Sequence, residues 1–250
     1  MQIVATGQEP LPLRAWASIR LVLWYFGTQL ALVVVIAFGA DLGLLLLSQP
    51  VRGMATDLVL LSLVPATLGA GVVVLIRLRR NLPGGAWEAI VAALGWRPVP
   101  RRILLSWALC GGAIAYLFVA GVIIRFRPPN AHEISSISRL LSTKSSIGRD
   151  SLLILAIGIA PPLEEFLFRG VLLAGLGTSW GVAPAVFASA GLFALAHLDQ
   201  IGGYWPAFVM ILGLALLATV LRLRYRSLLP GIGLHIGYNA MLMALSFHGT

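Results

Sequence analysis

The sequence is short of charge, of acidic residues and of cysteine. Only 11% of its 250 residues are charged, against about a quarter in ordinary soluble proteins. Nine residues are acidic, and 59% of the chain is hydrophobic. So few charges cannot cover a water-soluble surface, and the composition indicates a polytopic membrane protein. The one cysteine, Cys110, excludes an intrachain disulfide.

Seven apolar runs are long enough to be membrane helices, so we expect an all-α transmembrane bundle of about seven (six to eight) helices with a buried polar cavity. The expected spans are residues 21–40, 58–76, 103–124, 151–176, 180–198, 201–221 and 228–247. We expect three parts: a cytoplasmic N-terminal segment (1–20), a three-helix membrane part with a long loop (21–150), and a membrane region that carries the chemistry (151–250).

Lysine is also scarce, since Lys144 is the only one and arginine supplies the rest of the basic charge. This bias favours a prokaryotic plasma membrane. The net charge of +9 predicts no nucleic-acid partner here, because basic residues beside membrane helices set orientation. With seven spans, eleven arginines fall on one side and six basic residues on the other, which places the N-terminus in the cytoplasm. The eleven are Arg14, Arg20, Arg77, Arg79, Arg80, Arg97, Arg101, Arg102, Arg222, Arg224 and Arg226.

Three charged residues interrupt the fourth apolar run, where each costs roughly 2.5–3.5 kcal/mol on insertion scales. Glu164, Glu165 and Arg169 follow Pro161 and Pro162. The two prolines predict a break or a kink, with a helix restarting near Pro162. Glu165 and Arg169 are four residues apart and can pair, whereas Glu164 points about 100° away and must face another group.

Other polar groups in the later runs are candidates for that partner. His197 ends the fifth run, and His235 and Asn239 share one face of the seventh. A carboxylate and an imidazole can take a proton from water, and an imidazole and an amide can donate hydrogen bonds to an oxyanion. Counted from the predicted inner ends, Glu164 lies about 15–18 Å deep, His235 about 10 Å and His197 about 25 Å, so the helices must tilt or begin elsewhere for these groups to meet.

The motifs Glu164-Glu165-x-x-x-Arg169, Phe193-x-x-x-His197 and His235-x-x-x-Asn239 occur in this order. Their order resembles the CPBP (CAAX protease and bacteriocin-processing, or Abi) family of intramembrane proteases, which includes the type II CAAX prenyl endopeptidases. The resemblance covers roughly residues 151–247.

The resemblance implies an intramembrane endopeptidase that cuts a membrane-associated or lipidated protein or peptide. Glu164 and His197 would activate water, His235 and Asn239 would bind the oxyanion, and Glu165 and Arg169 would support the site. Zinc held by Glu164, His197 and His235 stays open as an alternative to metal-free water. Besides its substrate, the protein's expected partner is membrane lipid.

Two other functions fit parts of the pattern. Gly177-Thr178-Ser179-Trp180-Gly181 matches the nucleophile motif Gly-x-Ser-x-Gly, so Ser179 could serve a rhomboid-like serine protease from a connector between spans. Buried Glu, Arg and His also occur in membrane proteins that bind a partner without cutting it, such as immunity proteins of the same family.

Overall fold

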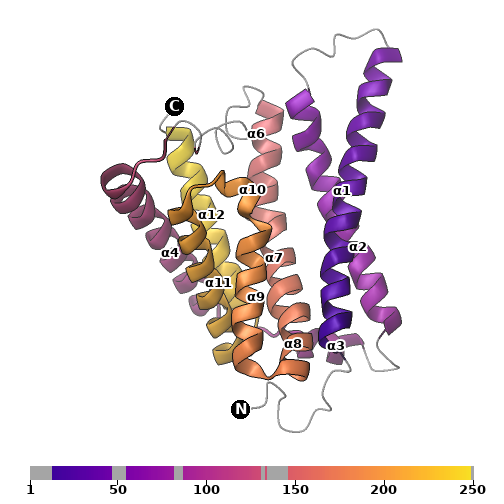
Figure 1. Cartoon of the computed structure of the whole chain (residues 1–250), viewed down its shortest axis with the longest axis vertical. Coiled ribbons are helices and arrows are strands. Elements are labelled where there is room, and N and C mark those ends of the chain that lie inside the picture. Colours follow the sequence, from indigo (N-terminus) through magenta and orange to yellow (C-terminus); the bar gives the residue numbers. More distant parts are fainter. Residues whose placement is uncertain (1–12, 47–54, 82–86, 131–132, 134–145, 249–250) are drawn as a thin grey trace.

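The computed structural model describes residues 13–46, 55–81, 87–130, 133 and 146–248. Within these ranges the chain is all α-helical, with no strand. The elements (Figure 1) are α1 (Ala15–Leu46), α2 (Ala55–Asn81), α3 (Trp87–Ala93), α4 (Arg101–Leu117), η1 (Phe118–Phe126), α6 (Ser146–Leu153), η2 (Ile154–Ile159), α7 (Ala160–Glu165), η3 (Phe166–Leu172), α8 (Leu173–Trp180), α9 (Val182–Ala196), α10 (Leu198–Ile201), α11 (Trp205–Tyr225) and α12 (Leu229–His248). The segments marked η are π-helical.

Each predicted span falls on a helix, and five of these helices are long and apolar enough to cross a membrane. They are α1, Asp57–Arg80 of α2, Arg101–Phe126, Ser146–Trp180 and α11. Helix α9 is apolar but has 15 residues, fewer than the roughly 20 that a span needs. Helix α12 has 20 residues and carries His235 and Asn239. These five long helices define an integral membrane protein, and the count of seven spans stays a prediction.

The predicted first part is described only from Leu13 onward, and α1 already begins at Ala15, so the end of the expected 1–20 segment is helical. Figure 1 shows α1 and α2 as a hairpin beside the helix that runs from α6 to α8. Helix α4, which we assigned to the N-terminal part, packs along α12. The division at residue 150 stays a prediction.

Glycines let α4 and α12 approach backbone to backbone. A Cβ on Gly111 would lie 2.0 Å from the Leu234 carbonyl oxygen, and one on Gly237 would lie 1.8 Å from the Ala108 carbonyl oxygen. Neither position has room for any side chain. Small residues at such crossings are the usual means of tight helix packing in membranes, and here they fix the helix that carries His235 and Asn239.

The helix through Glu164 is continuous from Ser146 to Trp180, so the predicted break at Pro161 and Pro162, with a restart near Pro162, is wrong, and the alternative of a kink there stays a prediction. The helix widens instead into the π-helical turns η2 and η3 on either side of α7. Two prolines remove two backbone donors, and the π turn before them changes the hydrogen-bond pattern without ending the helix. The run also extends to Trp180, beyond the predicted end at residue 176.

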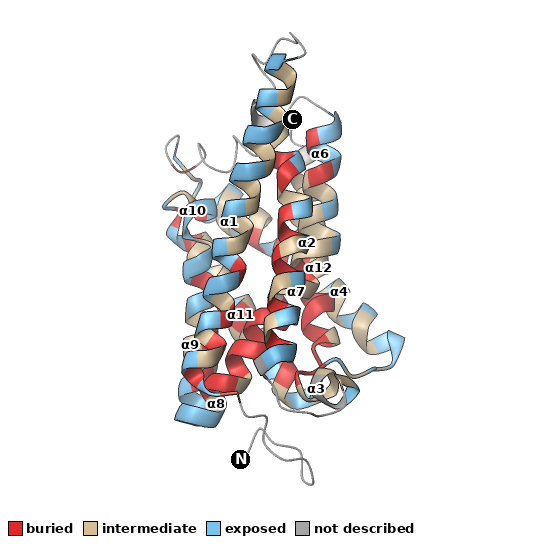
Figure 2. Ribbon diagram, turned by 90° about the vertical axis from the view of Figure 1, so that its right-hand side faces the viewer, coloured by how far each residue is buried: buried red, intermediate tan, exposed pale blue. Residues whose placement is uncertain are grey.

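The packed core lies in the half of the bundle nearest the start of α1. Figure 2 shows much of the buried (red) ribbon in that lower half, around α8 and α11, with further buried stretches above it. The cluster includes Leu94, Phe166, Val171 and Leu228, of which Phe166 is the most exposed, at 4%. The upper half is looser, and the cavity described below opens into it.

Candidate active site

The six predicted site residues line one cavity of about 630 Å³. Glu164 and Glu165 end α7, Arg169 lies in η3, His197 follows the last residue of α9, and His235 and Asn239 lie in α12. Residues that are 75 positions apart in the sequence therefore meet inside the bundle.

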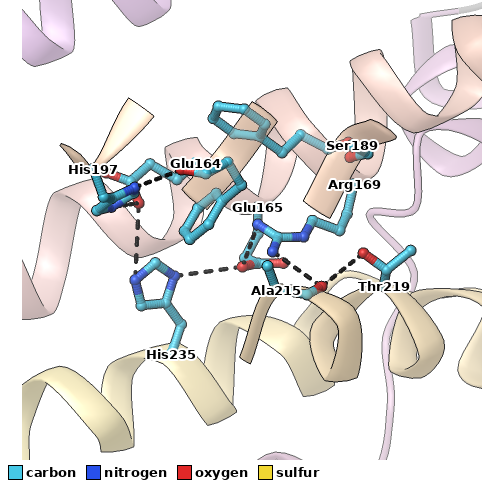
Figure 3. Close-up of polar contacts among 10 residues, drawn as sticks. Glu164, Glu165, Arg169, Ser189, His197, Ala215, Thr219 and His235 are labelled. Atoms are coloured by element: carbon cyan, nitrogen blue, oxygen red, sulfur yellow. Dashed lines mark hydrogen bonds and ion pairs between the residues drawn. The ribbon is translucent and has the colours of Figure 1, made fainter. Parts of the chain in front are cut away.

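The Glu164 carboxylate lies between two imidazoles (Figure 3). Its Oε2 atom is 3.8 Å from Nε2 of His197 and 3.8 Å from Nε2 of His235. These distances are too long for direct hydrogen bonds, which end near 3.2 Å. A water molecule about 2.8 Å from Oε2 and from one Nε2 would bridge that pair. The geometry suits a water held between acid and base.

The backbone fixes the ring of His197. Its Nδ1 lies 2.8 Å from the carbonyl oxygen of Phe193, one helical turn earlier. A carbonyl oxygen only accepts, so Nδ1 carries the hydrogen, and Nε2 of the neutral ring presents its lone pair to Glu164. The rings of Phe193 and His197 also stack, with centroids 4.5 Å apart. His197 therefore faces the cavity as a proton acceptor.

Glu165 and Arg169 form the predicted ion pair, with Oε1 and Nη1 3.1 Å apart. Their side chains are 2% and 1% exposed, whereas those of Glu164, His197 and His235 are 21%, 14% and 14% exposed. The pair is thus almost fully buried in the cavity wall, and the other three side chains are more exposed to the space inside it.

The same ion pair holds His235 from behind. Oε1 of Glu165 lies 3.4 Å from Nδ1 of His235. Arg169 is held by the Ala215 carbonyl oxygen, 3.2 Å from its Nη2, and by the face of the Phe193 ring, 4.2 Å from its Cζ. A carboxylate oxygen therefore lies near each ring nitrogen of His235.

Asn239 is anchored by the π turn η2. The Ala160 N–H donates to the Leu155 carbonyl, five residues back, and Pro161 has no N–H. The Ala156 carbonyl oxygen therefore receives no hydrogen bond from its own helix. Nδ2 of Asn239 donates to it instead, at 2.8 Å. One hydrogen of the amide group stays available to the cavity.

Sequence reasoning missed the cavity wall that α1 and α2 supply. Tyr25, Gln29 and Thr67 line the cavity. Nε2 of Gln29 donates to Oγ1 of Thr67 at 2.7 Å, and Tyr25 also hydrogen-bonds Thr67. The sequence did contain a signal for this wall, because Gln29 and Thr67 are polar residues inside apolar runs. Neither has a polar partner three or four residues away in its own helix, so neither formed a recognisable motif.

A second polar cluster lies at the far end of the cavity, near α10. Arg127 binds Glu133 through both carboxylate oxygens, at 2.9 and 3.1 Å, and the Asn130 N–H donates to Glu133 at 2.8 Å. These hydrogen bonds lower the pKa of Glu133 below its usual range, and the bond from the Arg127 guanidinium has the largest effect. The Tyr204 hydroxyl, which lines the cavity, donates to the Arg127 carbonyl.

The zinc alternative finds no support among the described residues. Among the described residues, no group of three His, Cys, Asp or Glu side chains is placed to hold a metal ion, and Glu164, His197 and His235 are included in that set. The metalloendopeptidase assignment is therefore unsupported, and no step below passes through a metal.

The connector predicted around Ser179 is also wrong. Thr178 donates its hydroxyl to Ala174 within α8, and the helix continues to Trp180. Oγ of Ser179 accepts the N–H of Ala15 at 2.9 Å. Ser179 does not line the cavity that holds both histidines, so it joins α8 to the start of α1 and has no imidazole partner there.

The fold and the site define an integral membrane helix bundle with an acid–imidazole cluster in an internal cavity. Residues 150–241 match the family model described as type II CAAX prenyl endopeptidase Rce1-like. This segment match points to an intramembrane endopeptidase that acts on a protein or peptide. No curated protein matches the chain, and no solved structure does.

Proposed function

We propose that the protein hydrolyses a peptide bond within the membrane by means of water activated by Glu164 and His197. The observation that carries the proposal is the position of the Glu164 carboxylate, 3.8 Å from Nε2 of both histidines inside the cavity. Three polar groups from three helices are costly in an apolar bundle, and water between them accounts for their spacing.

In the proposed reaction Glu164 takes a proton from the water as it attacks the carbonyl carbon. Nε2 of His197 accepts from the same water and orients it. Oxygen charge develops on the far side, where Nε2–H of His235 and the free N–H of Asn239 donate to it. Glu164 then returns its proton to the leaving amine, so that the carboxylate is restored.

Glu165 and Arg169 take no part in proton transfer in this scheme. Their buried pair supplies a fixed acceptor for Nδ1 of His235, so that the ring keeps the orientation in which Nε2 faces the oxyanion. The substrate would be a membrane-associated or lipidated protein or peptide.

The test compares cells that carry the wild-type protein, the Glu164→Gln variant or the His197→Ala variant. Mass spectrometry of membrane-derived peptides should find cleavage products with wild type only, while both variants insert and melt at an unchanged temperature. Glu88→Gln is the matched control, because Glu88 is an exposed carboxylate on α3. The same products in Glu164→Gln cells would reject the mechanism, and no products in any cells would favour a non-catalytic binding protein.

A further inference from the structure

The cavity wall that α1 and α2 supply carries a polar group of its own. These two helices precede the matched residues 150–241, and the residues that they contribute to the wall are Tyr25, Phe26, Gln29, Leu63 and Thr67. The three polar members bond to one another: Nε2 of Gln29 donates to Oγ1 of Thr67 at 2.7 Å, and Tyr25 hydrogen-bonds Thr67. Polar side chains within apolar membrane helices are costly, and those that face a cavity usually serve a function.

The packing of α1 sets the level of Gln29 in the bundle. Helix α1 runs antiparallel to the helix that contains α7, η3 and α8 (Figure 1). Two contacts fix the register: the Ala15 N–H donates to Oγ of Ser179 at 2.9 Å, and the ring centroids of Phe26 and Phe168 are 6.4 Å apart. Eleven residues separate the two contact points on each helix. Gln29 lies three residues beyond Phe26, so it is level with the glutamate pair at the end of α7.

The Gln29 carboxamide has hydrogen-bonding capacity to spare. Tyr25 and Thr67 are 2% and 1% exposed, whereas Gln29 is half-buried. The bond to Thr67 uses one amide hydrogen, and within the described part of the chain no donor bonds to Oε1, which is not buried. A carboxamide has two donor hydrogens and an acceptor oxygen, so one N–H and the oxygen remain for a ligand. A staple between α1 and α2 accounts for the bond to Thr67 but not for the accessible oxygen.

From this placement we infer that Gln29, oriented by Thr67, binds the main chain of the substrate beside the bond that is cut. A peptide must be extended for water to reach its carbonyl carbon, and each N–H and C=O freed in an apolar cavity needs a partner. The remaining N–H and oxygen of Gln29 match the C=O and N–H of one peptide group. Such pairing reads no side chain, so the subsite accepts different sequences. The inference rests on the proposed function and adds a binding residue from outside the matched segment.

Binding of an uncut peptide tests this subsite without turnover. The probe is acetyl-Leu-Leu-Leu-Leu-methylamide, titrated calorimetrically into the Glu164→Gln protein in detergent. Three further probes each carry an ester oxygen in place of one N–H between two leucines. In the same background, Gln29→Met removes the carboxamide at similar length, and Thr67→Val removes the hydroxyl at similar shape. Thr28→Val is the matched control, because Thr28 is a half-buried neighbour on α1 that does not line the cavity.

We expect Gln29→Met to weaken binding of the all-amide probe about fivefold to tenfold, as for the loss of one hydrogen bond. Thr67→Val should act in the same direction, and Thr28→Val should have no effect. One ester probe should bind weakly when Gln29 is present and be weakened no further by Gln29→Met. A role in packing alone would not single out one peptide N–H in this way.

Three results overturn the inference. They are unchanged affinity in Gln29→Met, an additional loss in that variant with every ester probe, and no binding of the all-amide probe to the Glu164→Gln protein. If Gln29→Met does not fold, the comparison is made with Thr67→Val. Cleavage products that persist in Glu164→Gln cells would reject the hydrolytic mechanism and leave the binding result intact.

Discussion

Asn239 donates to the Ala156 carbonyl that a π turn has released from its own helix, at 2.8 Å. Pro161 keeps this carbonyl available, because a residue with an N–H at that position would donate to it in the π pattern. The two prolines beside the glutamates thus act through Asn239, 83 residues away.

Replacing Pro161 should therefore impair turnover through Asn239. In Pro161→Ala, either the new N–H or that of Ala160 takes the Ala156 carbonyl, and Asn239 loses its anchor. One such hydrogen bond is worth about 1 kcal/mol, so we expect kcat to fall about fivefold to tenfold with KM unchanged. Pro162→Ala is the matched control, because its new N–H would face Ile157 or Gly158. Equal loss in both variants, or a full effect of Pro161→Ala in an Asn239→Ala background, would contradict this role.

The buried ion pair should show a strong asymmetry between single and double substitutions. Arg169→Met leaves Glu165 buried without its partner, and breaking a buried pair in this way costs roughly 3–5 kcal/mol. The double substitution Glu165→Gln with Arg169→Met removes both charges and should recover most of the loss. Thermal unfolding in detergent measures both. If the double variant were no more stable than the single one, the two side chains would not be coupled as described.

The cluster of Arg127, Asn130 and Glu133 predicts a pH-dependent contribution to stability. The Arg127 guanidinium and the Asn130 N–H lower the pKa of Glu133 from its ordinary value of 4.5. A carboxyl with a depressed folded pKa stabilises the protein above its unfolded pKa, and this stabilisation is lost as pH falls through the folded value. Wild type should therefore melt above Glu133→Gln at pH 7, and the two curves should converge in acid. A gap between them that stays constant with pH would show that Glu133 acts by packing alone.

Cleavage should be insensitive to metal removal. Because the described residues contain no group of His, Cys, Asp and Glu placed to hold an ion, we expect full activity after treatment with EDTA or phenanthroline, and no zinc in the purified protein. Activity lost to the chelator and restored by zinc would overturn the metal-free mechanism.

The close crossing of α4 and α12 should not tolerate a methyl group. A Cβ on Gly237 would lie 1.8 Å from the Ala108 carbonyl oxygen, so Gly237→Ala must push the helices apart. Overpacking of this kind costs about 1–3 kcal/mol or more, and here it also shifts His235. Gly213→Ala in α11 is the control, because nothing lies within 4 Å of its added carbon. Similar melting temperatures for both variants would contradict the close approach.

The sequence predicted helix positions well because each apolar run had to satisfy its backbone within a helix. The helix ends predicted from the sequence were less accurate, so the membrane depths predicted for the site residues were also inaccurate. Since α8 continues to Trp180 and α9 begins at Val182, Glu164 and His197 lie 16 and 15 residues from that turn, about 24 and 22 Å. The predicted depths differed because the Gly-Ser-rich stretch resembled a connector.

The depth of His235 could not be read from its own helix. Helix α12 starts on the segment after α3, which packs on Gly170, ten residues before the end of α8. That support raises the start of α12 by about 15 Å relative to the α8–α9 turn, and brings His235 level with Glu164. Only long-range packing sets this stagger. Local patterns were enough to identify the charged motifs, since isolated carboxylates in apolar runs are rare.

The α1–α2 hairpin places Tyr25, Gln29 and Thr67 across the cavity from Glu164, and all three precede the matched residues 150–241. Part of the cavity wall therefore comes from a stretch of the chain separate from the one that carries the proposed hydrolytic groups. In the enzyme that we propose, mutations in the first third of the chain would reshape this part of the wall while the proposed hydrolytic groups stay in place, which makes those two helices the natural target for redirecting it to a new peptide.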